Sequence, residues 1–356
     1  MGTRLSPGGI LLFAVSLAVF LGASMGPMPA VAEPRPVRFS FASTFPGSMT
    51  LIGEGAHLLA AKIARASGGE IVFDFHEPGA LVPAAQTLHA VSRGEVDAGW
   101  GGAGWFSGVD TAFNMFSSVP FGPGIGEYMA WMYRGGGLTL ARELFAPYRL
   151  HNIPCAVIPP EASGWFRKEI RTVADLRGLR MRFFGLGAQV MAKLGVQTRA
   201  LAPGEIYAAL QAGTLDATEF SLPAMDQKLG FHQVAKYYYF PGWHQQATFF
   251  DLYINKTKWE ELSDRHQAII ELACGDMVRE AIAEGEAAQW KAMTEMQASG
   301  VQIRRWPSEI IAAMESAWNE VVAEESARNP NFRRVYASYA AFRRDYAIWR
   351  EHAYLK

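Results

Sequence analysis

Residues 178–187 read Gly178-Leu179-Arg180-Met181-Arg182-Phe183-Phe184-Gly185-Leu186-Gly187, so a strand-like run ends there at an arginine and a glycine-rich turn. Two later segments, 216–220 and 241–246, also follow strand-like sequence and carry carboxylate and amide side chains. A guanidinium fork can hold a carboxylate through two hydrogen bonds, and carboxylate, amide and carbonyl oxygens are ligands for hard cations. Together these segments predict a pocket that captures a carboxylate, directly or through a metal.

The first 32 residues are expected to be a signal peptide. Arg4 supplies a short positive region, residues 10–21 form an apolar run, and Ala30-Val31-Ala32 offers a small-x-small cleavage pattern. The apolar run is shorter than the roughly 20 residues of a transmembrane helix, although an uncleaved membrane anchor is the alternative. We therefore expect a periplasmic chain of 324 residues (356 minus 32), cleaved near Ala32.

Charge and cysteine content narrow the classes of partner. Without Arg4 the chain has 32 basic and 34 acidic residues, a net charge of −2, and it has no lysine- or arginine-rich run. This balance argues against nucleic acid and anionic lipid as partners. Cys155 and Cys274 could pair in an oxidising compartment, but two buried thiols are the favoured prediction, because free cysteines are often buried.

Hydrophobic periodicity alternates between strand and helix patterns. Strand patterns occur at 37–43, 71–75, 96–99, 151–157, 179–182 and 248–255. Helix patterns occur at 51–65, 84–93, 188–194, 205–211 and, as one very long helix, at 263–299. This order favours an α/β protein in which helices flank parallel sheets.

The length of the chain exceeds that of one ordinary core, so two lobes are expected. No flexible linker separates them, so strands should cross between the lobes near 158–161 and 246–251. Lobe I is expected to comprise 33–158 and about 252–328, and lobe II 159–251, with 329–356 as a C-terminal helix. The long helix should lie across both lobes, and the pocket should lie in the cleft between them.

Standard catalytic signatures are absent from the sequence. A nucleophile-elbow pattern occurs at residues 22–26, inside the expected signal peptide, and no phosphate-binding loop or His-Glu-x-x-His motif is present. His244 is a candidate general base only if a nucleophile lies nearby. Binding is therefore favoured over catalysis.

Arg182 is informative mainly through its setting. An arginine at a strand end usually makes a surface ion pair, and a lone Glu219 is usually solvated or paired. Phe183 and Phe184 would bury Arg182, however, and the glycines that follow let the backbone approach a ligand. Trp105, in the glycine-rich segment 99–105, is equally well explained as a core residue or as a pocket wall.

At these residues the sequence resembles the solute-binding proteins of TRAP transporters, the DctP-like class, over essentially the whole mature chain. It is especially similar to the branch that binds α-keto acids in the periplasm. The shared motifs are Ser92-x-Gly94-x-Val96, Val119-Pro120-Phe121-Gly122, Gly164-Trp165-Phe166-Arg167-Lys168-Glu169-Ile170, Leu176-x-Gly178-Leu179-x-Met181-Arg182, Gly204-Glu205-Ile206, Asp216-Ala217-Thr218-Glu219 and Lys236-Tyr237-Tyr238-Tyr239-x-Pro241-Gly242-Trp243-His244.

The resemblance implies the two-lobed periplasmic binding-protein fold, with hinge strands and a helix that spans both lobes. It implies that Arg182 pairs with the solute carboxylate. It further implies a cation, sodium or calcium, beside the organic acid, with ligands at Glu161, Glu219, the Phe220 carbonyl and Gln245. Residues 329–354 resemble a helix with which that branch dimerises, although their aromatic spacing fits an internal packing face equally well.

Several positions depart from the pattern of that branch. Glu161 stands where glutamine is usual and Gln245 where glutamate is usual, so the carboxylate count is kept while the charge moves across the pocket. Gly104 replaces a usual tyrosine, which is expected to open volume, and Phe183-Phe184 replaces a usual Ile-Pro pair. These changes predict a solute with a larger or flatter apolar part than pyruvate.

The resulting hypothesis is a periplasmic receptor that binds an organic monocarboxylate between its lobes and docks on membrane permease subunits. Arg182, Glu161 and Phe220 would contact the solute, and Trp105, Phe184 and Trp243 would form an aromatic wall. No organic cofactor is expected. Two alternatives are an exported enzyme that acts on carboxylates, with Glu219 or His244 as base, and a sensory receptor for a membrane kinase.

Overall fold

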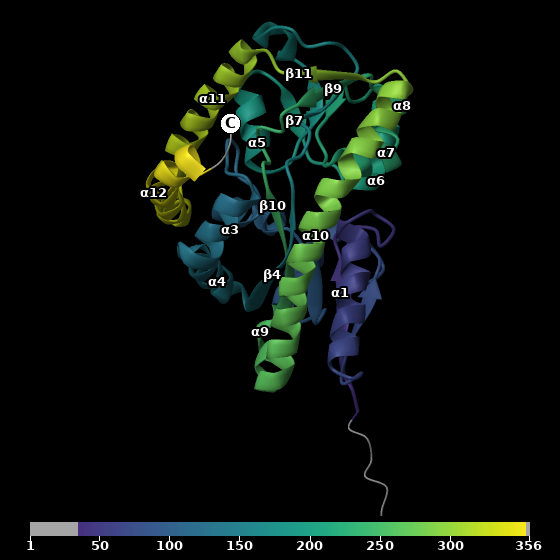
Figure 1. Cartoon of the computed structure of the whole chain (residues 1–356), viewed down its shortest axis with the longest axis vertical. Helices are drawn as coiled ribbons and strands as arrows, with labels where there is room; N and C mark the ends of the chain where they lie inside the picture. The colour runs from purple at the N-terminus through teal and green to yellow at the C-terminus, as the bar shows by residue number, and fades with distance from the viewer. Residues whose placement is uncertain (1–34, 354–356) are drawn as a thin grey trace, which may run out of the picture. The chain divides into compact units, whose positions relative to one another are not determined.

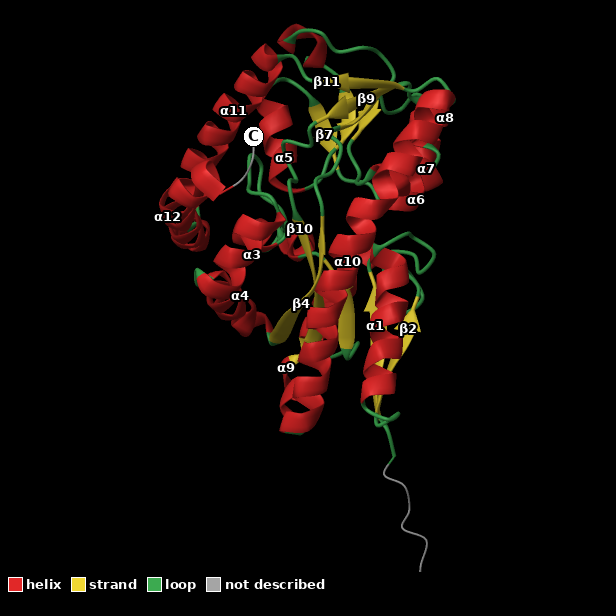
Figure 2. Cartoon of the chain, in the orientation of Figure 1, coloured by secondary structure: helices red, strands yellow, loops and turns green. Residues whose placement is uncertain are grey.

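Two β-sheets, with helices packed around them, form the framework of the protein (Figures 1 and 2). The computed structural model describes residues 35–353. The expected signal peptide, residues 1–32, lies outside the described residues. Among the described helices, none combines the length and the apolar character needed to cross a bilayer.

The first sheet has five strands in the order β2-β1-β3-β10-β4. Their bounds are β1 Val37–Ser43, β2 Ile71–His76, β3 Ala98–Gly101, β4 Leu150–Ile158 and β10 Thr248–Asn255. β1 runs parallel to β2 and β3, whereas β10 runs antiparallel to both β3 and β4. Phe39 and Phe41 of β1 are fully buried, as the alternation of its sequence predicts.

The second sheet has six shorter strands in the order β11-β9-β5-β8-β6-β7. Their bounds are β5 Gly164–Phe166, β6 Arg180–Arg182, β7 Gln197–Arg199, β8 Ala217–Thr218, β9 Tyr237–Phe240 and β11 Gln302–Arg305. β6 lies parallel to β7 and β8, and β5 lies antiparallel to β8 and β9.

Both sheets are therefore mixed, and the prediction of purely parallel sheets is wrong for β10 and β5. The reason lies in the path of the chain. β4 leads the chain out of the first sheet toward β5, and β10 brings it back after β9, so β4 and β10 must run in opposite directions. The two crossings, at 159–163 and 241–247, are close to those expected from the sequence.

The helices surround these sheets. They are α1 Ile52–Ala66, α2 Thr87–Arg93, α3 Ile125–Arg134, α4 Gly137–Phe145, α5 Gly185–Lys193, α6 Pro203–Gln211, α7 Pro223–Lys228, α8 Phe231–Val234, α9 Lys256–Glu260, α10 Asp264–Ala298, α11 Ser308–Arg328 and α12 Pro330–Ala353. Two 3-10 helices matter for the site, η2 Ala103–Phe106 and η3 Thr111–Phe116.

The expected long helix is α10, with 35 residues. At 1.5 Å per residue it is about 50 Å long. It packs on β4 and α1 beside the first sheet and, further along, on α7, as Figure 1 shows. Gly285 lies where the helix passes a crossing segment, since a Cβ atom there would come 2.5 Å from Pro159 Cδ. The helix thus contacts elements beside both sheets, as the sequence predicts.

Cys155 and Cys274 form a disulfide between β4 and α10. The prediction of two buried thiols is therefore wrong, although both residues are buried. The sequence places one cysteine on a strand and one on a helix, but it does not show that this helix packs directly on this strand, with the two Cα atoms 4.2 Å apart.

The C-terminal helices connect the two sheets in another way. α11 packs against α5, beside the second sheet, whereas α12 packs against η3, α3 and α4. β11, within the segment expected in lobe I, pairs with β9 in the second sheet. This strand departs from the expected lobe I boundary, because the chain returns to the second sheet after α10.

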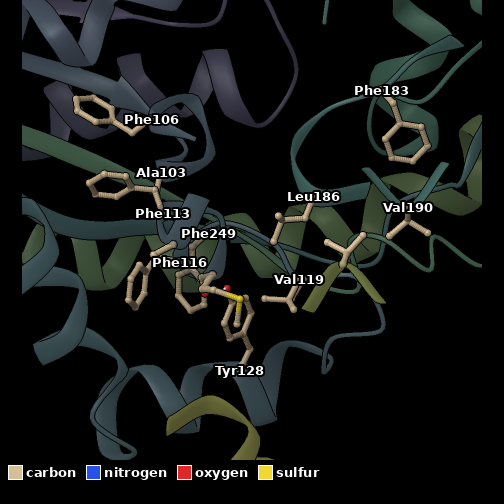
Figure 3. Packing of buried hydrophobic residues seen from close by; sticks show 14 of the residues in the cluster. Ala103, Phe106, Phe113, Phe116, Val119, Tyr128, Phe183, Leu186, Val190 and Phe249 are labelled. Atoms are coloured by element: carbon tan, nitrogen blue, oxygen red, sulfur yellow. The ribbon is translucent and has the colours of Figure 1, made fainter. Parts of the chain in front are cut away.

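The aromatic residues at the start of α12 form an internal packing face. Phe332, Val335 and Tyr339 are buried, whereas Ile348 and Trp349 near the end of the helix are exposed. Figure 3 shows the buried cluster nearby, in which Phe116 and Val119 belong to the same set as Leu186 and Val190 of α5. Elements beside both sheets therefore share one core.

Candidate functional site

Arg182 ends strand β6 and is buried, as the sequence predicts. Its Nη1 donates to the Glu219 carboxylate (2.7 Å to Oε2) and to the Glu219 carbonyl (2.8 Å). Its guanidinium lies over the ring of Phe220, 5.3 Å from the centroid. Nη2 makes no hydrogen bond with the part of the chain that the structure describes, and Arg182 lines a cavity. One donor nitrogen is therefore available to a ligand.

Glu219 reaches Arg182 because of strand pairing. β8 lies parallel to β6 with Thr218 opposite Arg182, so the next residue leaves the sheet beside the arginine. The Glu219 N–H donates to the Arg182 carbonyl (3.0 Å), and the Phe184 N–H donates to Glu219 Oε2 (3.2 Å). Arg182, at the end of β6, and Phe184, just after it, thus hold the carboxylate.

Glu161 and Gln245 come from the two crossing segments. Glu161 follows β4 and Gln245 precedes β10, and the Glu161 N–H donates to the Gln245 carbonyl (3.1 Å). The Ser221 hydroxyl donates to Glu161 Oε1 (3.3 Å). Burial, followed by the nearby charges of Glu219 and Asp226, raises the pKa of Glu161 well above its ordinary value. Unlike Glu219, Glu161 has no hydrogen bond from an arginine among the described residues.

His244 joins the same group, although the sequence suggested it only as a possible base. Its Nε2 lies 3.4 Å from Glu219 Oε1 and 3.8 Å from Glu161 Oε2, and all three side chains are buried. Each offers one ligand atom, and these atoms lie within 4.8 Å of one another. The only sequence signal was its position beside Gln245. We call Arg182, Glu161, Glu219, His244 and Gln245 the ionic corner.

The donor set of the ionic corner fits a hard cation. The Gln245 carboxamide lies between Glu161, Glu219 and His244 on one side and Thr248 on the other. With its nitrogen turned inward, Gln245 donates to Glu161 Oε2 (3.0 Å) and Glu219 Oε1 (3.1 Å). With its oxygen turned inward, it adds a third oxygen beside two carboxylates, an arrangement that a cation would stabilise. The orientation of this amide therefore decides whether Gln245 donates to the two carboxylates or offers a third oxygen to a cation.

The space free of protein atoms beside the ionic corner, including the part open to solvent, is about 440 Å³. Its lining residues are Phe45, Ile52, Gly102, Trp105, Ser117, Glu161, Arg182, Phe184, Glu219, Phe220, Ser221, Gln245, Thr248 and Phe250. The structure thus brings Arg182, Glu161, Trp105, Phe184, Glu219, Phe220 and Gln245 together, as the sequence predicts.

Besides Phe220, four aromatic side chains line this cavity. Phe45 and Phe250 meet edge to face at 5.6 Å, and Trp105 lies 5.2 Å from Phe184. We call these four residues the ring wall. Phe45 and Phe250 were missed in the sequence, although Phe45 follows the carboxyl end of β1, where ligands of α/β sheets commonly lie.

Gly104 does not open the volume that its sequence position suggested. A Cβ atom at Gly104 would lie 2.8 Å from two carbons of the Phe184 ring. The ring of Phe184 therefore occupies space that any side chain at position 104 would need. The expectation of a larger cavity at this point is wrong, because the ring of Phe184 fills the space that Gly104 leaves free.

Trp243 is not among the residues that line the cavity. Its ring packs against Phe121, Phe183 and His244, at centroid distances of 5.6, 5.8 and 5.6 Å. It is almost completely buried. Its place in the predicted aromatic wall is therefore taken by Phe45 and Phe250, and Trp243 supports His244 from behind.

Comparisons with known proteins agree with this architecture. The DctP family of bacterial extracellular solute-binding proteins, family 7, matches residues 42–329. A monocarboxylate 2-oxoacid-binding periplasmic protein of Nostoc is 34% identical over 314 residues, which covers 88% of this chain and 86% of the relative.

Solved structures of similar proteins cover most of the chain. A TRAP transporter solute-binding protein from Bordetella bronchiseptica, a dimer with calcium and picolinate in one active site, is 35% identical, with a TM-score of 0.87 and coverage of 89% of this chain and 94% of its own. A TRAP periplasmic solute-binding protein from Pseudoalteromonas atlantica, with bound sodium and pyruvate, is 28% identical, with a TM-score of 0.85 and coverage of 88% and 96%. One from Colwellia psychrerythraea, with calcium and pyruvate, is 27% identical, with the same TM-score and coverage.

A two-lobed α/β fold, a buried arginine beside a cavity and a family match over four fifths of the sequence lead to one conclusion. The chain belongs to the DctP family of solute-binding proteins, the solute receptors of TRAP transporters.

Proposed function

We propose that this receptor binds an organic monocarboxylate of the 2-oxo or 2-hydroxy type in the cavity between the ionic corner and the ring wall. The observation that carries the proposal is the buried Arg182, which lines the cavity and keeps Nη2 free of protein partners among the described residues. A buried guanidinium that faces a cavity strongly favours an anionic ligand over a neutral one.

A cation would complete the ionic corner. Glu161, Glu219 and Gln245 would supply side-chain oxygens, the Phe220 carbonyl a backbone oxygen, and His244 a nitrogen close to the same point. Sodium or calcium suits the oxygen ligands. The cation would offset the charge of Glu161 and would give the oxo or hydroxy oxygen of the acid a partner. The relatives with calcium or sodium beside pyruvate or picolinate support this assignment.

The ring wall favours an acid with a flat or bulky apolar part. Phe45, Trp105, Phe184 and Phe250 line the same cavity as the charged groups. Aromatic faces stabilise planar groups through stacking in addition to burial of area. An aromatic or branched 2-oxo acid would therefore use contacts that pyruvate leaves unused.

Binding without turnover is the proposed activity. The Ser221 hydroxyl donates to Glu161, while His244 Nε2 faces two carboxylates, so the described contacts do not pair a serine nucleophile with an imidazole base. Docking of the loaded receptor on TRAP membrane subunits would follow closure around the solute. A sensory role with a membrane kinase is the alternative, and no contact in the cavity favours it.

Export and assembly complete the proposal. Cleavage near Ala32 would release the receptor into the periplasm, where the Cys155–Cys274 disulfide can form. Residues 329–353 would supply a homodimer contact through the exposed Ile348 and Trp349 near the end of α12. The dimeric relative from Bordetella bronchiseptica supports this possibility.

Calorimetric titration tests the proposed function. The purified receptor is titrated with pyruvate and with picolinate, each in calcium chloride and in a chelator. We expect saturable binding of at least one acid, tighter with calcium, and no loss of the acid over hours of incubation. Tight binding of a neutral sugar with no response to either acid would contradict the proposal, and consumption of the acid would favour the enzyme alternative.

A further inference from the structure

Glu325 is a fully buried carboxylate that lies outside the cavity. It belongs to the last turn of α11, on a helix whose neighbouring residues, such as Glu324, are exposed. A buried carboxylate needs several hydrogen-bond donors to offset the loss of hydration. The donors to Glu325 come from elements that lead to different residues of the cavity lining.

Three donors converge on Glu325. The Thr111 hydroxyl, at the start of η3, donates to Oε2 (2.6 Å), and the Gln189 amide, in α5, donates to Oε1 (2.8 Å). Arg328, one turn further along α11, contacts both oxygens. Although burial opposes it, these bonds from Arg328, Thr111 and Gln189 lower the pKa of Glu325 below its ordinary value.

Both partner elements lead directly to the cavity. α5 begins at the residue after Phe184, which lines the cavity as part of the ring wall. η3 ends one residue before Ser117, which also lines the cavity. One carboxylate on a third helix therefore connects the segments that lead to Phe184 and to Ser117 of the lining.

A second set of hydrogen bonds holds η3 against the start of α12. Asn329 donates to Thr111 Oγ1 (3.0 Å) and to Asp110 Oδ1 (2.6 Å), and Asn331 donates to Asp110 Oδ2 (2.7 Å). Asp110 in turn caps η3 through the Ala112 N–H. The start of α12 thus holds η3 in place, whereas on the α5 side Glu325 depends on Gln189.

We propose that Glu325 is a positioning residue for solute binding, a latch that holds α5 and η3 together while the cavity is closed. The inference rests on the proposed function, because it concerns retention of the same acid. Hinge closure in binding proteins brings the two walls of a site together around the ligand. Any movement that separates α5 from η3 must break the bond of Glu325 to Thr111 or to Gln189. The latch therefore stabilises the closed arrangement selectively and slows solute release.

The test compares Glu325→Gln with Glu324→Gln. Glutamine keeps the size of the side chain but brings an amide against the donors of Gln189 and Arg328. The control changes the preceding residue of the same helix, whose exposed carboxylate binds Lys193 of α5 but has no contact with η3 among the described hydrogen bonds and ion pairs. With picolinate and calcium chloride as probe, we expect Glu325→Gln to weaken binding about tenfold or more, mainly through faster dissociation, and Glu324→Gln to stay within about twofold.

A milder pair of variants distinguishes loss of the latch from a general loss of stability. Gln189→Met removes only the α5 arm and leaves Glu325 bonded to Thr111 and Arg328, and Lys193→Met on the same helix is its control. We expect Gln189→Met to speed picolinate release with little change in the thermal midpoint of the ligand-free protein. Equal dissociation rates of picolinate for Gln189→Met and Lys193→Met would contradict the proposal that Glu325 acts as a latch.

A ligand-free measurement keeps the two proposals distinguishable. Small-angle scattering of the unliganded proteins should give a larger radius of gyration for Glu325→Gln than for Glu324→Gln and wild type. If wild type binds neither acid but this difference appears, the proposed function fails while the latch stands. If wild type binds picolinate but Glu325→Gln matches its control in both scattering and release, the latch fails alone.

Discussion

The ionic corner and the ring wall lie at one cavity but are built by different means. In the ionic corner, hydrogen bonds from residues at strand ends and crossing segments orient Arg182, Glu219 and Glu161. The ring wall is held by packing, and Phe184 lies where it does because Gly104 has no side chain. We therefore propose that the corner determines whether an acid binds, while the wall determines which acid binds best.

The largest expected effect comes from Arg182→Ala. The substitution removes the partner of the solute carboxylate and leaves the buried Glu219 without its guanidinium. We expect binding of pyruvate or picolinate to weaken by about 2–5 kcal/mol, measured by calorimetry. Arg180→Ala is the matched control, because Arg180 lies on the same strand with a half-exposed side chain paired to Asp216. Similar losses for both variants would show that the corner has no special role.

The next effect concerns the cation. Glu161→Gln removes one of the two carboxylates of the corner, and we expect it to reduce affinity in calcium by about 1.5–3 kcal/mol, the range for a charge-assisted contact. The addition of Gln245→Glu should restore most of this loss, because it returns the second carboxylate to the opposite side of the site. Titrations in calcium and in chelator measure both variants. A Glu161→Gln variant that responds to calcium like wild type would remove Glu161 from the cation site.

A smaller and more selective effect is expected from the ring wall. Phe184→Leu keeps an apolar side chain but removes the ring that lies beside Trp105. Picolinate should lose about 0.5–1.5 kcal/mol more affinity than pyruvate, because only the aromatic acid uses stacking contacts. Parallel titrations of the two acids give this difference within one variant. Equal losses for the two acids would mean that the ring only fills space.

The smallest effect on binding is expected for Asp251→Asn, which tests a buried carboxylate that does not line the cavity. Burial raises the pKa of Asp251 to about 7, although the hydrogen bond from the Tyr253 hydroxyl opposes the shift. The folded state then keeps its proton to a higher pH than the unfolded state, so the free energy of unfolding should fall as pH rises from about 4 to about 7. Asp251→Asn should flatten this decline without a change in picolinate affinity.

Urea unfolding at a series of pH values measures the decline in stability. Asp345→Asn, in an exposed part of α12, is the control and should keep the wild-type slope. If Asp251→Asn retains that slope as well, the titration of Asp251 does not govern the stability of the ligand-free receptor in this range.

Much of the ionic corner could be predicted from the sequence because strand ends determine it. Arg182 ends one strand with a clear pattern and Gln245 precedes another, and the parallel pairing of β6 with β8 brings Glu219 beside Arg182. β8 and β11, of two and four residues, were not recognised, because they are too short to show a period.

Only two of the four residues of the ring wall could be predicted from the sequence. Trp105 and Phe184 could be named, but Phe45 and Phe250 depend on how the first sheet faces the second, which no local pattern records. Trp243 shows the opposite limit, since its neighbours in sequence line the site while its own ring packs away from the cavity. Glu325 gave no sequence signal, because a glutamate on a long polar helix is ordinarily exposed.

The Cys155–Cys274 disulfide has a consequence for how the receptor matures. It joins β4 to α10, the helix that contacts elements beside both sheets. The two cysteines are 119 residues apart in the sequence. A loop of that length contributes about 4–5 kcal/mol when closed by a disulfide. A chain produced in a reducing cytosol would lack this contribution, so recombinant protein intended for affinity measurements should be oxidised during refolding or secreted by its host.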